Sequence, residues 1–127
     1  MKLTLVLISL AALAATSAPA IAADKTSTCF RMQDIRNHTV GDDHTLYLNV
    51  GGRSVYRVEM SNNCLGGTSS SDPIVLKERG SSSICQAIDL DVSATVNGGG
   101  LSSRCIVDTL TKLTSAQASA LPKKVQP

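Results

Sequence analysis

The stretch Thr45-Leu-Tyr-Leu-Asn-Val-Gly-Gly-Arg-Ser-Val-Tyr-Arg-Val-Glu-Met60 determines the fold of this chain. It contains two short runs in which apolar and polar side chains alternate, and a pair of glycines separates them. Alternation with a period of two places every second side chain on the same face of a strand. The stretch therefore predicts an antiparallel hairpin whose buried face carries Leu46, Leu48, Val50, Tyr56, Val58 and Met60.

The register of this hairpin follows from its two apolar faces. A two-residue loop sets Leu46 opposite Arg57 and brings charge onto the buried face. A three-residue loop, which includes the arginine after the glycines, sets Leu46 opposite Val58 and Leu48 opposite Tyr56. A slip of one residue turns every side chain of a strand to the other face, so we expect the three-residue loop.

The same alternation predicts further strands, and none of them is separated from the next by a long amphipathic helix. In residues 88–96, Ile88 and every second residue after it face one side, whereas acidic and hydroxyl side chains face water. Residues 97–100 then break the chain. Polar loops are predicted over residues 36–44, 66–72 and 79–83, and the remaining strands over residues 28–35, 73–77 and 105–110. We therefore expect an all-β, mainly antiparallel domain of about six strands, either a small disulfide-bridged barrel or a sandwich, and a parallel βαβ sheet is excluded.

The two ends of the chain differ from this body. Lys2, the apolar run over residues 3–15 and the exit Ala20-Ile21-Ala22 have the pattern of a secretory signal peptide, which we expect to be cleaved after residue 22. This run is too short to span a bilayer, and we expect no transmembrane segment. Residues 23–113 then form a single β domain, because about 105 residues remain after cleavage. Residues 114–127 contain a short helix before Pro122 or a disordered tail, with the disorder expected over residues 123–127.

Four cysteines lie in the exported part of the chain, at Cys29, Cys64, Cys85 and Cys105. An even number of cysteines in a small exported domain predicts two disulfides, and no close pair of the kind that binds zinc is present. The chain has no tryptophan and three other aromatic residues, so its core is poor in large side chains and needs covalent support. Four cysteines allow three pairings; we favour Cys64–Cys85 with Cys29–Cys105, and the alternatives stay open.

One polar cluster could carry chemistry, namely His38, Asp42, Asp43 and His44. Two imidazoles and two carboxylates within seven residues could bind a divalent metal or form a general acid–base pair. The simpler interpretation is a solvated loop in which Asp42 and Asp43 bond to nearby backbone as turn residues. We favour that interpretation, and we assign no catalytic residue, metal ligand or cofactor.

Other functional classes find little support. No Gly-x-Ser-x-Gly elbow is present, and residues 98–100 lack the Lys-Ser/Thr of a phosphate-binding loop. Without Lys2 the chain has 11 basic and 10 acidic residues, with no basic block apart from Lys123-Lys124. Nucleic-acid binding needs a concentrated basic face, so we expect none.

The ordered set of cysteines and short motifs resembles the DUF6491 family of small exported bacterial proteins of unknown function. The resemblance covers residues 28–113 and consists of Cys29, Ile35, Asp42-Asp43-His-Thr-Leu-Tyr-Leu48, Tyr56-Arg57-Val58, Cys64-Leu65, Ile84-Cys85, Asp89, Cys105-Ile106 and Leu110. It implies a bacterial envelope setting, which favours the periplasm or secretion. It supplies no catalytic residues.

These observations favour a non-catalytic exported β domain that binds an envelope component or another exported protein. Two alternatives stand beside it. One is a metal-binding or acid–base enzyme that uses the cluster from His38 to His44. The other is an inhibitor of an exported hydrolase, which would present Arg53 at the hairpin tip or the loop over residues 69–73, since a pre-ordered loop loses little entropy on binding. The partner and the oligomeric state are not readable from the sequence.

Overall fold

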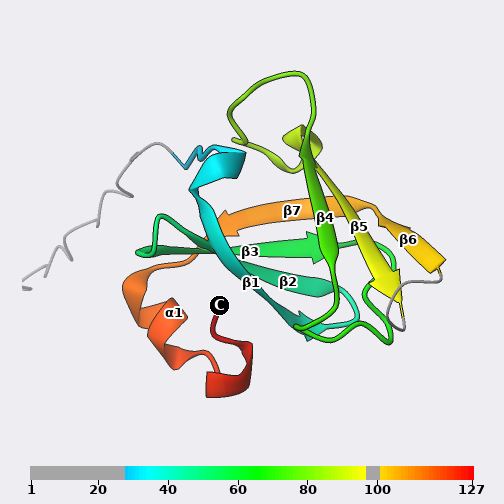
Figure 1. Cartoon of the computed structure of the whole chain (residues 1–127). Coiled ribbons are helices and arrows are strands. Elements are labelled where there is room, and N and C mark those ends of the chain that lie inside the picture. The colour runs from blue at the N-terminus through cyan, green and yellow to red at the C-terminus, as the bar shows by residue number, and fades with distance from the viewer. Residues whose placement is uncertain (1–27, 97–100) are drawn as a thin grey trace, which may run out of the picture.

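The structure of the chain, a computed structural model, describes residues 28–96 and 101–127. The predicted signal peptide, residues 1–22, and the predicted break at residues 97–100 lie outside the described residues. Seven strands form the described part (Figure 1). In chain order the elements are η1 (Met32–Asp34), β1 (Ile35–Asp42), β2 (Thr45–Val50), β3 (Ser54–Met60), β4 (Ile74–Glu78), η2 (Ala87–Asp89), β5 (Leu90–Val96), β6 (Leu101–Cys105), β7 (Val107–Lys112), α1 (Ser115–Ala120) and η3 (Lys123–Val125).

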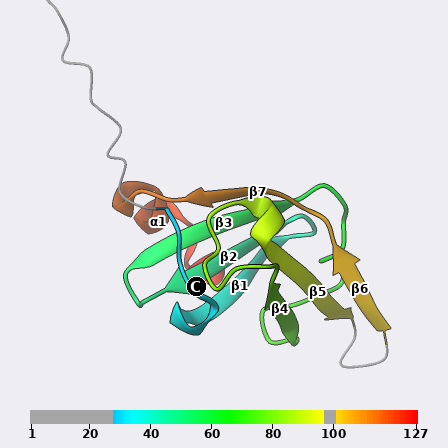
Figure 2. The same ribbon diagram turned by 90° about the horizontal axis from the view of Figure 1, so that it is seen from above.

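The strands form two antiparallel sheets, as the prediction of an all-β, mainly antiparallel fold requires. The first sheet has the order β1-β2-β3-β7 and the second the order β4-β5-β6. Ile106 alone separates β6 from β7, so the chain passes from the second sheet to the first at this residue. Figure 2 shows β6 of the second sheet continuing into β7 of the first at this corner. The sheets are not closed into a barrel, so the barrel alternative is wrong and a two-sheet arrangement is correct.

The β2–β3 hairpin has the predicted register. Leu46 lies opposite Val58 and Leu48 lies opposite Tyr56, and the loop has three residues because Val50 pairs with Ser54. Both glycines of the loop have positive φ, the conformation that L side chains adopt at a steric cost.

The predicted apolar face of this hairpin is the core of the protein. All six of its apolar side chains are buried and pack against β5 residues Leu90, Val92 and Ala94. Phe30 and Tyr56 lie with their ring centroids 4.6 Å apart. The third ring, Tyr47, is on the opposite face of the sheet, so aliphatic side chains supply most of the core.

Several predicted boundaries are wrong, each because a tertiary contact overrides the local pattern. Residues 36–44 do not form a loop: most of them belong to β1, an edge strand whose polar side chains reach solvent. The strand predicted over residues 28–35 is a single bridge, from Phe30 to Ile84, followed by η1. The return strand predicted over residues 105–110 is divided between two sheets, and its first part, β6, begins at Leu101. Ile88 does not join the buried row of β5, because it lies in η2 and points outward.

The C-terminal segment covers the outer face of the first sheet. The predicted short helix is present as α1, whose capping box joins Thr114 and Gln117. Residues 123–127 are ordered rather than disordered. Val125 is buried, and the backbone carbonyl of Gln126 accepts a hydrogen bond of 3.2 Å from the Thr39 hydroxyl. Side-chain hydrogen bonds from the sheet therefore fix a tail whose composition alone predicts disorder.

Two disulfides are present, but with a different connectivity from the favoured one. Cys29 pairs with Cys85 and Cys64 pairs with Cys105, which is another of the three pairings that the sequence allows. Strand neighbours explain the difference. The Phe30–Ile84 bridge brings the residues beside it, Cys29 and Cys85, together. Pairing of β3 with β7, which sequence spacing does not reveal, brings the segment after Met60 to the corner at Cys105.

We predict that these disulfides supply a large part of the free energy of unfolding. They close loops with sequence separations of 56 and 41 residues, each worth about 3–4 kcal/mol in the chain-entropy model. In urea denaturation, Cys64→Ala/Cys105→Ala should lose about that amount relative to the oxidised parent. Equal unfolding free energies for the oxidised and the fully reduced parent would contradict this prediction.

Candidate docking groove

The described surface has a groove at the corner between the two sheets. Its volume is about 630 Å³. It is lined by Arg79, Ala87, Ile88, Leu90, Arg104, Cys105, Ile106, Val107 and Asp108. These residues come from η2, the start of β5 and the residue after β4 (Arg79) on one side and from the β6–β7 corner on the other.

Two isoleucines are exposed at this groove. Ile88 on η2 is 71% exposed, and Ile106 at the corner is 61% exposed. Scattered exposed apolar residues are normal on a protein surface, but two β-branched side chains on facing sides of one groove form a local apolar site. Covering an isoleucine completely is worth about 1.5–3 kcal/mol, so the pair can contribute substantially to binding.

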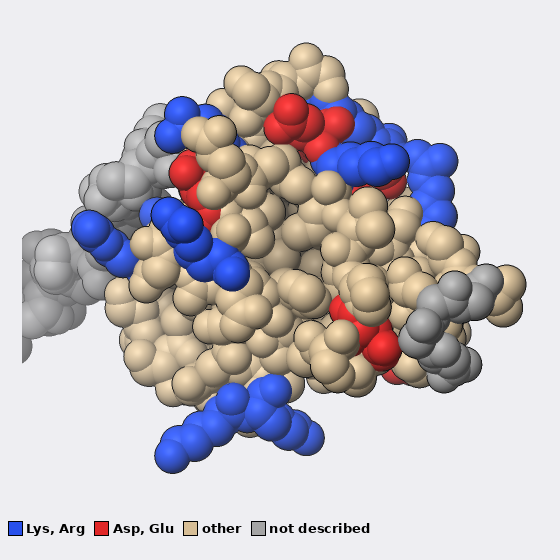
Figure 3. All heavy atoms as spheres, in the orientation of Figure 1, with Lys and Arg blue, Asp and Glu red and all other residues tan. Residues whose placement is uncertain are grey.

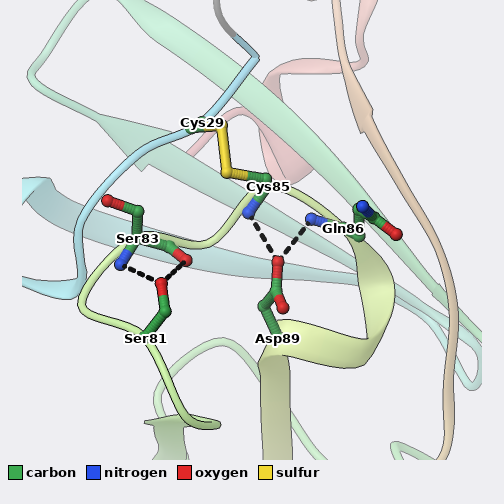
Figure 4. Close-up of a disulfide and its surroundings, with 6 residues drawn as sticks. All are labelled: Cys29, Ser81, Ser83, Cys85, Gln86 and Asp89. Atoms are coloured by element: carbon green, nitrogen blue, oxygen red, sulfur yellow. Dashed lines mark hydrogen bonds between the residues drawn. A yellow bond between two sulfur atoms is a disulfide. The ribbon is translucent and has the colours of Figure 1, made fainter.

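Asp89 fixes the η2 side of the groove. Its carboxylate accepts hydrogen bonds from the backbone N–H of Cys85, at 3.0 Å, and of Gln86, at 2.9 Å (Figure 4). The Cys29–Cys85 disulfide lies directly behind these amides. Ile88 is therefore presented by a short turn that a carboxylate and a covalent bridge hold in place.

Asn62 fixes the opposite side. Its side-chain amide donates to the carbonyl of Arg104 at 3.0 Å, and its side-chain oxygen accepts from the N–H of Ile106 at 2.9 Å. The N–H of Ser61 donates to the carbonyl of Ile106 at 2.9 Å. The Cys64–Cys105 disulfide joins the same two segments. Ile106 thus projects from a backbone whose polar groups are already satisfied.

A charged cluster lies beside the apolar rim. One guanidinium nitrogen of Arg79 is 3.3 Å from an Asp91 carboxylate oxygen, and one of Arg104 is 3.4 Å from the other oxygen. Each arginine uses a single nitrogen in this way, and the Arg79 and Arg104 side chains are 46% and 69% exposed, so both can donate further hydrogen bonds to a ligand. Figure 3 shows basic and acidic side chains gathered over this part of the molecule. This rim therefore presents two guanidinium groups, with Asp91 between them and Asp108 also in the lining of the groove.

The residues of the predicted polar cluster lie on β1 and in the turn that follows it. His38 and Asp42 lie within β1, and Asp43 and His44 form the β1–β2 turn. The Asp42 carboxylate accepts a hydrogen bond of 2.8 Å from the N–H of His44, as the turn interpretation predicts. In residues 28–96 and 101–127, no three His, Cys, Asp or Glu residues lie close enough together to hold a metal ion.

The sequence contains a signal for the groove that the strand pattern conceals. Ile106-Val107 and Ala87-Ile88 are adjacent apolar pairs in segments that alternate elsewhere. In an extended segment such as the one around Ile106-Val107, only one member of such a pair can face the core. The outward member is Ile106 in the first pair and Ile88 in the second.

Comparison with known proteins gives one match. A family model described as a family of unknown function (DUF6491) matches residues 1–126, in agreement with the resemblance seen in the sequence. No curated protein and no solved structure matches the chain. No helix in the described parts of the chain is long and apolar enough to cross a membrane.

We predict that Asp89→Ala destabilises the groove and the domain. The substitution leaves the N–H groups of Cys85 and Gln86 without their acceptor, which costs about 1–3 kcal/mol. Thermal unfolding measures the loss, and amide hydrogen exchange at these two positions should accelerate. Asp108→Ala, which removes another acid of the groove, is the matched control and should change neither quantity. Equal effects of the two substitutions would contradict the role given to Asp89.

A second prediction concerns the β1–β2 turn. The hydrogen bond from the His44 N–H holds the pKa of Asp42 below its ordinary value of 3.8. A depressed pKa in the folded state means that the contribution of Asp42 is fully present above its unfolded pKa. This contribution is lost as the pH falls through the lower folded pKa. An NMR titration should place the Asp42 midpoint below 3.8, and Asp42→Ala should flatten the acid limb of the stability curve. A midpoint at or above the ordinary value would refute the assignment.

Proposed function

The chain belongs to the DUF6491 family, and for this member of it we propose a non-catalytic docking function: the domain binds another exported protein of the bacterial envelope through the groove between η2 and the β6–β7 corner. The observation that carries the proposal is the pair of exposed isoleucines on opposite sides of this groove. Interfaces of stable complexes commonly have an apolar centre and a polar rim, and the groove offers both.

The construction of the groove supports a binding role. A disulfide and a side-chain cap fix each of its two sides, so little conformational freedom is lost when a partner binds. Arg79 and Arg104 at the rim favour a partner that carries a carboxylate next to an apolar side chain. The two disulfides are consistent with an oxidising exported location, and we place the protein in the periplasm or outside the cell.

The test is site-specific photo-cross-linking in the source bacterium, with a photoreactive amino acid at position 106. We expect one major exported protein to be captured. The captured protein is then purified and titrated with the wild type, with Ile88→Ser/Ile106→Ser and with Leu101→Ser. The double variant should bind about tenfold to a hundredfold more weakly, because it removes the apolar contact surface.

Leu101→Ser is the matched control. Leu101 is 77% exposed and lies at the other end of β6 from the groove, so this variant should bind like the wild type. Equal weakening by both variants would show that the groove is not the binding site. Turnover of a substrate by the purified oxidised protein, abolished by a surface substitution, would replace the docking function with an enzymatic one.

A further inference from the structure

The strand β4 is an edge of the second sheet, and its hydrogen bonds to β5 show which of its backbone groups are free. The N–H of Arg79 donates to the carbonyl of Asp89, and the N–H of Thr95 donates to the carbonyl of Pro73. In an antiparallel pair the residues that exchange hydrogen bonds alternate with residues that do not. The odd-numbered residues of β4 therefore bond to β5. The N–H and carbonyl groups of Ile74, Leu76 and Glu78 point away from the sheet.

The other strand edges have side-chain or tertiary protection. The hydroxyl of Ser70 accepts from the N–H of Val40 on β1, and Asn62 caps β6 at Arg104. The edge strand β7 packs against η2. For β4, no hydrogen bond within the described residues caps Ile74 or Leu76, and η1 packs beside the strand toward its Glu78 end. An exposed edge of this kind can form backbone hydrogen bonds with a strand of another chain.

The side chains of β4 are apolar where the edge is open. Val75 is 45% exposed on the outer face of the sheet. Ile74 and Leu76 on the inner face are only partly buried, although they pack against the core. Beside the edge lies a shallow hollow of about 410 Å³, lined by Met32 and the residues from Leu76 to Glu78.

We infer that β4 is a dimerisation strand, which pairs antiparallel with β4 of a second copy about a two-fold axis at Val75. In this register Val75 lies opposite Val75 of the partner subunit, and Ile74 lies opposite Leu76 of the partner subunit. Every apolar side chain of the strand then meets an apolar one. The outward N–H and carbonyl groups of Ile74 and Leu76 exchange hydrogen bonds across the axis.

Neighbouring registers fit less well. An axis at Leu76 sets Ile74 opposite Glu78 of the partner subunit, and an axis at Lys77 sets two lysines opposite each other. Both also extend the pairing toward the Glu78 end of β4. There Arg31, Met32 and Gln33 lie beside the strand and leave less room for a second chain. With the axis at Val75, Lys77 stays next to Asp91 of its own subunit, its neighbour across the β4–β5 ladder.

The test measures the oligomeric state of the oxidised protein by sedimentation over a range of concentrations. We expect a monomer–dimer equilibrium in the wild type. Val75→Glu places two carboxylates across the axis and should weaken dimerisation by about tenfold or more. Val75→Thr keeps the β-branched shape without charge and should still dimerise. Because Val75 is exposed, none of these changes should lower the unfolding temperature of the monomer appreciably.

A cross-link reports the register. The two residues at the axis form a pair without mutual hydrogen bonds, whose Cα atoms lie about 4.5 Å apart, within reach of a disulfide. Val75→Cys should therefore form a covalent dimer with the native bridges intact, as peptide mapping would show. Ser93→Cys, on the same face but one strand inward, should stay monomeric on non-reducing gels. A wild type that remains monomeric at every concentration, or a dimer that Val75→Glu leaves unchanged, would overturn the inference.

Discussion

The Cys64–Cys105 disulfide holds the corner on which the two-sheet arrangement depends. At this corner the chain leaves β6 in one sheet and enters β7 in the other after a single residue. A turn this short leaves little room for side-chain packing to fix the angle between the sheets, and the core offers few rings to do so. The disulfide anchors the last residue of β6 to the segment that follows β3, and Asn62 of that segment binds the backbone on both sides of the corner. The disulfide and these hydrogen bonds therefore fix the corner, while the packing of the β2–β3 hairpin against β5 holds the two sheets face to face.

The groove is a consequence of that corner. Ile106 cannot enter the core because Cys105 before it is committed to the disulfide and Val107 after it pairs with Met60 of β3. The second disulfide fixes the facing side by joining η2 to the N-terminal segment beside Phe30. The two disulfides thus have two effects. They stabilise a domain with a small core, and they hold the segments from which Ile88 and Ile106 point outward. Removal of either bridge would loosen one side of the groove together with the fold.

The sequence predicts the parts of the fold that local rules determine. The β2–β3 register follows from alternation and from the glycines, because a slip would put Arg57 on the buried face. The α1 cap follows from Thr114 and Gln117, which are three residues apart. The disulfide pairing is not local: it depends on β7 lying next to β3, a contact between segments about 50 residues apart. Local rules do not predict the groove for the same reason, since its two sides come from η2 and from the β6–β7 corner, and only the fold brings them together.

The open edge of β4 and the groove belong to the same small sheet but occupy different parts of it. The edge is on the outer side of β4, whereas the groove lies where β5, β6 and β7 meet. Pairing through β4 would therefore leave both grooves of a dimer accessible. If both grooves of a dimer bind the same envelope assembly, binding of the first groove raises the effective concentration of the second. The overall affinity then increases without any new contact. A domain of this size, with only two isoleucines at its groove, has little apolar area for a tight single-site interaction. Dimerisation through β4 would double a small binding site and so strengthen docking without a larger groove. It would also pair the backbone groups that remain open at the β4 edge of a monomer.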